Sequence, residues 1–187
     1  MGTGIKTFFF RTLRIIKYQL LSTCNSVTGK PILYYPLLLN GQGSISFGKS
    51  VQNGVINSPG FYSGYNYIEA RYKESKIIIG NNVSINNGFS AIAYNHITID
   101  NNVLFGINCR IEDSDGHVHH PHRRNDTDVP SAPVHIQENV FLGSGVTILK
   151  GVTIGRNSII GSNSVVTKSI PDNVIAAGNP AKVIRNL

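Results

Sequence analysis

The chain has 187 residues, 41% of them hydrophobic and 14% charged, with a formal net charge of +7. This length predicts one domain with appended segments, and the hydrophobic content excludes a largely disordered chain. The positive charge favours anionic partners such as phosphates or a membrane surface. The sequence shows no dense basic cluster and no RNA-binding motif, so nucleic acid is not an expected partner. Cys24 and Cys109 give no disulfide framework, which favours a cytoplasmic location.

Residues 1–42 are expected to form an amphipathic helix and a docking segment. Within KTFFFRTLRIIKYQLL, residues 6–21, helical spacing places Phe9, Leu13, Ile16 and Leu20 in one apolar stripe. The same spacing places Arg11, Arg14 and Lys17 on a separate basic arc. The cations interrupt any apolar run of signal-peptide or membrane-spanning length. We expect the helix to pack on the main domain or on a neighbouring subunit with its basic face in solvent. A peripheral contact with a membrane surface is the alternative.

A period of six residues dominates positions 43–170. Apolar residues recur at this interval in three series: Ile79, Ile85 and Ala91; Ile99, Phe105 and Ile111; and Ile136, Leu142, Ile148, Ile154, Ile160 and Val166. A helix repeats near 3.6 residues and a plain strand at two, so neither explains a period of six. Short strands joined by Gly- and Asn-rich corners explain it, because three such units close one triangular rung. The pattern therefore predicts an all-β solenoid of stacked hexapeptide units.

Residues 113–133 interrupt this repeat, because Ile111 ends one series and Ile136 resumes it. The interruption begins with DSDGHVHHPHRRND, which contains four histidines. A long loop on a rigid scaffold often carries catalytic or binding residues. A histidine can accept a proton near neutral pH, which favours general-base chemistry. The spacing fits no familiar zinc site, so a metal centre is the lesser alternative.

Roughly residues 43–187 resemble the hexapeptide-repeat acyltransferases, whose fold is a left-handed parallel β-helix. The resemblance rests on DSDGHVHH, on VFLGSGVTILKGVTIGRNSIIGSNSVVTKSIP and on AAGNPAKVIR in the C-terminal tail, residues 171–187. Within that family the sequence is most similar to galactoside and maltose acetyltransferases and to bacterial polysaccharide O-acetyltransferases. The resemblance implies a homotrimer with active sites between subunits, acetyl-CoA as the donor, and no required metal.

The resemblance also implies roles for single residues. His117 matches the general base that acts on the acceptor, and Asp115 or Asp113 is expected to orient its imidazole. Ser144 matches the position that stabilises the thioester oxygen. Asn87 falls near an acceptor-binding asparagine, within one residue of alignment. The positions expected to contact the cofactor are Ser144, Ser162, Thr167, Lys168 and Arg185.

The expected function is therefore direct transfer of an acetyl group from acetyl-CoA to a sugar hydroxyl, in the biosynthesis or modification of a bacterial surface polysaccharide such as O-antigen or capsule. The compact helical segment of the galactoside and maltose enzymes is not matched by residues 1–42. This difference favours a lipid-carried glycan at the inner membrane face over a free sugar. The alternatives are N-acetylation of an amino-sugar nucleotide, a metal-dependent solenoid, and a non-catalytic scaffold.

Overall fold

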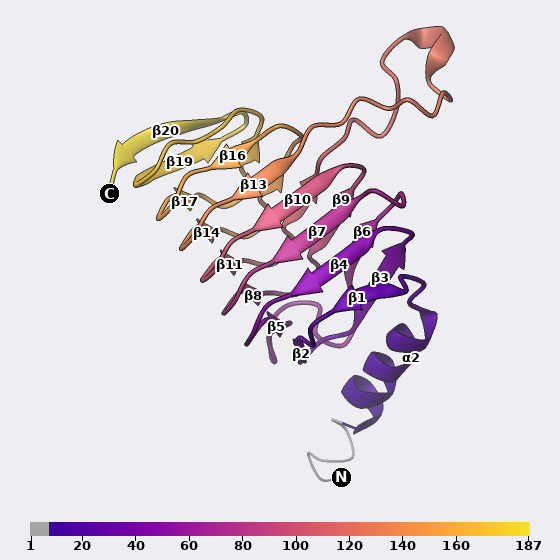
Figure 1. Cartoon of the computed structure of the whole chain (residues 1–187). Coiled ribbons are helices and arrows are strands. Elements are labelled where there is room, and N and C mark those ends of the chain that lie inside the picture. The colour runs from indigo at the N-terminus through magenta and orange to yellow at the C-terminus, as the bar shows by residue number, and fades with distance from the viewer. Residues whose placement is uncertain (1–7) are drawn as a thin grey trace.

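The computed structural model describes residues 8–187, so the first seven residues of the expected N-terminal segment lie outside it. Three sheets wind around one axis (Figure 1). The first contains β1 (Ser26–Thr28), β4 (Ser44–Phe47), β7 (Lys76–Ile79), β10 (His96–Ile99), β13 (Val134–Ile136) and β16 (Thr153–Ile154). The second contains β2 (Ile32–Leu33), β5 (Gln52–Asn53), β8 (Ser84–Ile85), β11 (Leu104–Phe105), β14 (Phe141–Leu142), β17 (Ile159–Ile160), β19 (Val174–Gly178) and β20 (Ala181–Asn186). The third contains β3 (Leu37–Gly41), β6 (Asn66–Ala70), β9 (Ser90–Ala93), β12 (Arg110–Glu112), β15 (Thr147–Ile148) and β18 (Val165–Val166).

The core consists of the six-residue series stacked in register. One column runs through Ile79, Ile99, Ile136 and Ile154. The other two columns contain Ile85, Phe105, Leu142 and Ile160, and Ala91, Ile111, Ile148 and Val166. All twelve side chains are buried in a single cluster. The predicted solenoid is confirmed, and the period of six corresponds to one strand and one corner.

Asparagine is frequent at the corners because the chain there requires a positive φ, which Asn tolerates better than most residues. Asn82, Asn102, Asn139 and Asn157 have φ values between 56° and 61°. Their side chains also join successive rungs: Asn82 Nδ2 donates to Asn102 Oδ1 at 3.2 Å, and Asn139 Nδ2 donates to Asn157 Oδ1 at 3.0 Å. The corner asparagines therefore set the backbone turn and link the rungs.

Both ends of the solenoid extend beyond the expected boundaries at residues 43 and 170. β1, β2 and β3 pair in parallel with β4, β5 and β6, so a first rung precedes residue 43. The residues Val27, Leu33 and Leu39 of this rung keep the period of six and pack against the core. At the other end, β19 pairs in parallel with β17, and β20 folds back antiparallel on β19. Part of the expected tail therefore continues the second sheet.

The expected N-terminal helix is present as a π-helical turn (η1, Phe8–Thr12) followed by α2 (Leu13–Leu21), but its orientation differs from the expectation. Arg14 donates through Nη1 to the carbonyl of Phe61 at 2.7 Å, and Arg11 donates through Nη2 to the carbonyl of Leu33 at 3.2 Å. Guanidinium groups can donate hydrogen bonds to the carbonyl groups at this end of the solenoid, whereas the side chains of the apolar stripe have no donors. The apolar stripe therefore faces solvent. None of the helices within residues 8–187 has the length and apolar character needed to cross a membrane.

Candidate functional site

The histidine loop, residues 113–133, leaves the solenoid after β12 and returns at β13. It projects well beyond the rungs (Figure 1). An antiparallel bridge between Ser114 and Ser131 closes its neck, and a short 3₁₀ turn (η2, Pro121–Arg123) lies at its far part. The expected excursion is thus a defined hairpin-like projection with a fixed base.

Asp113 holds the start of this loop against the preceding rung. Its carboxylate is fully buried and accepts the backbone N–H groups of Tyr94 and Asn95 at 2.7 and 2.8 Å. Burial raises the pKa of Asp113, and the hydrogen bonds from backbone N–H groups oppose this shift only in part. Each carboxylate oxygen is bonded to the solenoid, so Asp113 is placed as an anchor of the loop.

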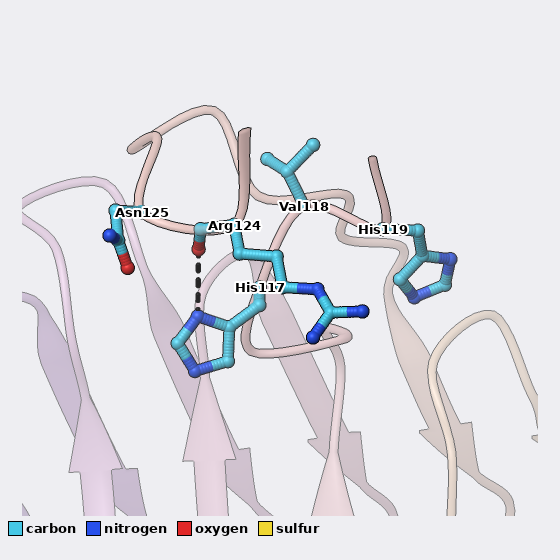
Figure 2. A pocket seen from close by; sticks show the side chains of 5 residues that line it. All are labelled: His117, Val118, His119, Arg124 and Asn125. Carbon is cyan, nitrogen blue, oxygen red and sulfur yellow. Dashed lines mark hydrogen bonds between the residues drawn. The ribbon is translucent and has the colours of Figure 1, made fainter. Parts of the chain in front are cut away.

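His117 lies on the exposed part of the loop with one ring nitrogen engaged. Its Nδ1 is 2.9 Å from the carbonyl oxygen of Arg124, as Figure 2 shows. A carbonyl oxygen only accepts hydrogen bonds, so Nδ1 carries the proton in this arrangement. Nε2 of a neutral ring then has a free lone pair, which is the protonation state that a general base requires.

Asp115 does not fill the expected orienting position in this structure, because the Arg124 carbonyl is the partner of His117 Nδ1. The carboxylate of Asp115 instead accepts a hydrogen bond from Lys150 Nζ and lies 3.1 Å from His119 Nε2. Lys150 follows β15, so this ion pair attaches the loop to the next rung of the solenoid. The proposed role of Asp115 in orienting His117 stays a prediction.

A cleft of about 350 Å³ opens beside His117, between the loop base and the third sheet. Its wall contains Arg71, Ile92, Tyr94, Arg110, Glu112 and Asp115. The guanidinium of Arg71 lies 4.7 Å from the centroid of the Tyr94 ring and binds both carboxylate oxygens of Glu69, at 2.8 and 2.9 Å. Hydrogen bonds from Arg71 and Tyr67 outweigh the effect of burial, so the pKa of Glu69 lies below its usual value.

The charges of this cleft are balanced by short ion pairs. Arg71 pairs with Glu69, and a second arginine, Arg110, pairs with Glu112. The wall therefore offers many hydrogen-bond donors and acceptors and an aromatic ring, without a net charge. Such a surface suits an uncharged ligand rich in hydroxyl groups.

Ser144 lies at the corner after β14, and Ser162 lies at the equivalent corner after β17. These corners stack closely: a Cβ atom at Gly106 would lie 2.5 Å from Ser144 N, and one at Gly143 would lie 2.7 Å from Ser162 N. Throughout residues 8–187, neither the N–H nor the hydroxyl of Ser144 is bonded to another protein group. Ser144 therefore has free donors, as the expected oxyanion role requires, but no contact joins it to His117 within this protomer.

The expected cofactor-binding residues lie near the C-terminal end of the solenoid. Thr167 and Lys168 follow β18 and are exposed, and Arg185 is an exposed residue of β20. Arg185 Nη1 is bonded only to the nearby carbonyl of Asn186. These cations are accessible to an anionic ligand, and their assignment to acetyl-CoA stays a prediction.

Asn87, the expected acceptor-binding residue, is 1% exposed. Its Oδ1 accepts the N–H of Val55 at 3.0 Å, and its Nδ2 donates to the carbonyls of Val55 and Pro59 at 3.2 and 3.3 Å. In this structure the side chain holds the segment around residues 55–59, and an acceptor would have to displace these bonds to reach it.

The histidines do not assemble a metal site in the part of the chain that the structure describes. No group of three or more His, Cys, Asp or Glu side chains there is arranged to hold a metal ion. His117 and His119 line the same pocket (Figure 2), and Nε2 of His119 lies 3.1 Å from the carboxylate of Asp115. Outside the loop, His135 is paired with Asp100 at 2.9 Å.

Several residues of the site have contacts that the sequence does not predict. Lys150 lies within a stretch that carries the family resemblance and Arg124 lies within the histidine-rich stretch, but the contacts that each makes in the site have no sequence signal. Arg71 and Tyr94 belong to no motif. Arg71, Tyr94 and Arg110 could have been found only by assigning the rung register, because they meet as β6, β9 and β12 stack in the third sheet.

Comparisons with known proteins agree with this fold. Residues 133–168 match the family model described as bacterial transferase hexapeptide (six repeats). The chain is 31% identical to a putative lipopolysaccharide biosynthesis O-acetyl transferase, WbbJ, of Escherichia coli K12, over 82% of this chain and 78% of the relative. It is 44% identical to the galactoside O-acetyltransferase of the same strain, over 60% of this chain but only 55% of the relative. The chain thus spans little more than half the length of that enzyme.

Solved structures of acetyltransferases have a similar fold. The polysialic-acid-specific acetyltransferase NeuO matches with a TM-score of 0.66 and 26% identity, over 87% of this chain and 83% of that chain. A galactoside acetyltransferase solved in complex with coenzyme A matches with a TM-score of 0.55 and 31% identity, over 86% and 64% of the two chains. Because a curated relative more than 30% identical is covered over most of its length, the likeness extends beyond the repeat. The chain belongs to the hexapeptide-repeat acetyltransferase family, with its left-handed β-helix.

Proposed function

We propose that this protein is an acetyl-CoA-dependent sugar O-acetyltransferase that acts in the assembly or modification of a bacterial surface polysaccharide. The single observation that carries the proposal is the arrangement of His117: Nδ1 donates to the Arg124 carbonyl, which leaves Nε2 as a proton acceptor beside a polar cleft. Membership of an acetyltransferase family supports the donor, and the putative lipopolysaccharide and polysialic acid enzymes among the relatives support a glycan acceptor.

The proposed reaction is a direct transfer in a ternary complex. The acceptor hydroxyl binds in the cleft and gives its proton to Nε2 of His117 as its oxygen attacks the thioester carbonyl. The N–H or hydroxyl of Ser144 stabilises the oxyanion that develops. Collapse of the tetrahedral intermediate breaks the C–S bond, and the proton passes to the leaving CoA thiolate.

We further propose that the active unit is a trimer, because Ser144 and His117 do not meet within one protomer. An outward-facing apolar stripe on the second sheet supports an interface there: Leu104, Phe141 and Ile159 are in register, and Leu104 and Phe141 are 47% and 44% exposed. A neighbouring protomer on this stripe would bring its own histidine loop toward Ser144. Light scattering should give a mass three times 20.4 kDa.

The charge-balanced wall of the cleft, together with Tyr94, favours an uncharged sugar as acceptor. Two free thiols, Cys24 and Cys109, are consistent with a reducing compartment such as the cytoplasm, where acetyl-CoA is made.

The test is release of CoA thiol from acetyl-CoA with a panel of acceptors: neutral free sugars, a lipid-linked neutral oligosaccharide, sialic acid and an amino-sugar nucleotide. We expect release with a neutral glycan and a product whose acetyl group is removed by hydroxylamine, as an ester is. An amide product from the amino-sugar nucleotide would show N-acetylation instead. No thiol release above the hydrolytic background with any acceptor class would contradict the proposal.

A further inference from the structure

The N-terminal helix presents its apolar side to solvent. We define the N-terminal apolar face as Phe8, Phe9, Phe10, Leu13, Ile16 and Leu20, which are between 41% and 81% exposed. These residues lie on one end of the molecule, where α2 covers the first rung (Figure 1). A contiguous patch of large apolar side chains on a soluble domain indicates a surface that binds something.

This orientation is fixed by specific contacts on the opposite side of the helix. Arg14 donates to the carbonyls of Phe61 and Gly64. Tyr18 stacks on Tyr65 with ring centroids 4.5 Å apart. Rotating the helix to bury its leucines would remove all these contacts, so the exposed face is a built feature of the fold.

The net positive charge of the chain is concentrated in the N-terminal part of the sequence. The first acidic residue in the sequence is Glu69, and residues 1–68 contain six lysines and arginines. The remaining residues carry eleven basic and ten acidic side chains, so almost all of the net charge of +7 arises before Glu69. Lys17 and Lys30 are both exposed, and Lys17 lies about one helical turn from both Leu13 and Leu20 in α2.

These charges favour a lipid bilayer over a second copy of this chain as the partner of the N-terminal apolar face. A contact between two copies of this end would bury Lys17 beside a second basic surface with no acidic side chain in the first 68 residues to pair with it, which is costly. On an anionic bilayer, Lys17 can reach the phosphates while its aliphatic stem stays among the leucines. The aromatic and aliphatic side chains then enter the boundary between headgroups and acyl chains.

We propose that the N-terminal apolar face, with Lys17 and Lys30, binds the surface of an anionic lipid bilayer. The contact is peripheral and independent of the acetyl-transfer activity. Binding through this face would also bring the histidine loop near the bilayer. The loop leaves the solenoid after β12, which lies three strand positions from β3 in the third sheet. At about 4.8 Å per strand, the base of the loop is roughly 14 Å from the rung that α2 covers.

The test is flotation of the full chain with lipid vesicles at low ionic strength, comparing pure phosphatidylcholine with a mixture containing phosphatidylglycerol. We expect binding only to the anionic vesicles and its loss when NaCl is raised to 0.5 M. Lys17→Gln should weaken binding about fivefold, the value expected for one lysine near an anionic surface. The triple variant Leu13→Gln, Ile16→Gln, Leu20→Gln should weaken binding at least tenfold.

Ile78→Gln is the matched control, because Ile78 is 40% exposed on the first sheet, outside the N-terminal apolar face; it should bind vesicles as the wild type does. Circular dichroism checks that each variant is folded. The proposal is overturned if the wild type does not bind anionic vesicles, or if the triple variant binds as well as the wild type. It is also overturned if the wild type ignores vesicles and the triple variant has a smaller mass by light scattering, since the face would then be a subunit contact.

Discussion

The solenoid supplies most of the folding stability, and the histidine loop carries the residue proposed as the general base. In the solenoid the same apolar position returns every six residues and is buried in each rung, so many equivalent contacts hold one rigid scaffold. Most residues of the loop are exposed, and it is joined to the scaffold by a few polar contacts, chiefly those of Asp113 and Asp115. A substitution in the core of the solenoid should therefore change the free energy of unfolding, and one in the exposed part of the loop should change the rate of reaction.

The largest difference is expected from a matched pair of aliphatic truncations. Ile136→Ala removes a fully buried side chain from the column that joins β10, β13 and β16, and should lower the free energy of unfolding by about 2–5 kcal/mol. Val118→Ala, in the loop, should change it by less than about 0.5 kcal/mol. Urea unfolding followed by circular dichroism measures both. Equal losses would show that the loop is part of the cooperative core.

A second comparison uses two aspartates of the loop. Asp113→Ala removes a buried carboxylate and leaves the backbone N–H groups of Tyr94 and Asn95 without their acceptor, which should cost about 1–3 kcal/mol of folding stability. Asp126→Ala removes an exposed carboxylate bonded to Arg123, and should be nearly neutral. If Asp113→Ala unfolds at the wild-type urea concentration, Asp113 is not the anchor of the loop.

A third prediction concerns the ion pair between Asp115 and Lys150. Asp115→Asn and Lys150→Met should each lower the rate of acetyl transfer by about tenfold, the low end for a hydrogen bond to a charged group. The double variant should lose no more than either single variant, because both remove one interaction. Additive losses would mean that Asp115 also acts on His117, as the sequence suggests. Steady-state rates of CoA release decide between the two.

The smallest effect is expected at Cys109, which is buried in the solenoid. Burial raises the pKa of its thiol to about 11, so little reactive thiolate exists at pH 8. A thiol reagent at that pH should modify at most one cysteine of the native chain, Cys24, and both cysteines after unfolding. Rapid modification of Cys109 in the native protein would indicate that the rungs open locally.

The sequence predicts the solenoid well because each rung repeats one local rule. Ile136 and Ile154 share a column because three units of six residues complete one rung and return the chain to the same sheet. The same reasoning fails where contacts join unrelated segments. The Arg124 carbonyl beside His117 and the pairing of Lys150 with Asp115 depend on how the loop folds back.

The N-terminal helix shows a second limit of prediction from the sequence. Its amphipathic pattern predicts that a helix forms, but the pattern does not say which side is buried. The open end of the solenoid binds guanidinium groups through carbonyls such as that of Phe61, so Arg11 and Arg14 face inward while Lys17 stays exposed. Asn87 shows the same limit. Its match to an acceptor-binding position does not predict that its side-chain amide is hydrogen-bonded to the backbone of Val55 and Pro59.

The measurement that tests the central claim most directly is the rate of acetyl transfer by His117→Ala, with the urea midpoint determined on the same sample. His119→Ala is the matched control, since His119 lies on the same loop but contacts Asp115 and does not hydrogen-bond to His117. We predict that His117→Ala loses at least about 100-fold in rate, the usual range for proton transfer by a general base, with an unchanged midpoint, and that His119→Ala stays within about tenfold of the wild type. A His117→Ala enzyme with the wild-type rate would contradict the account.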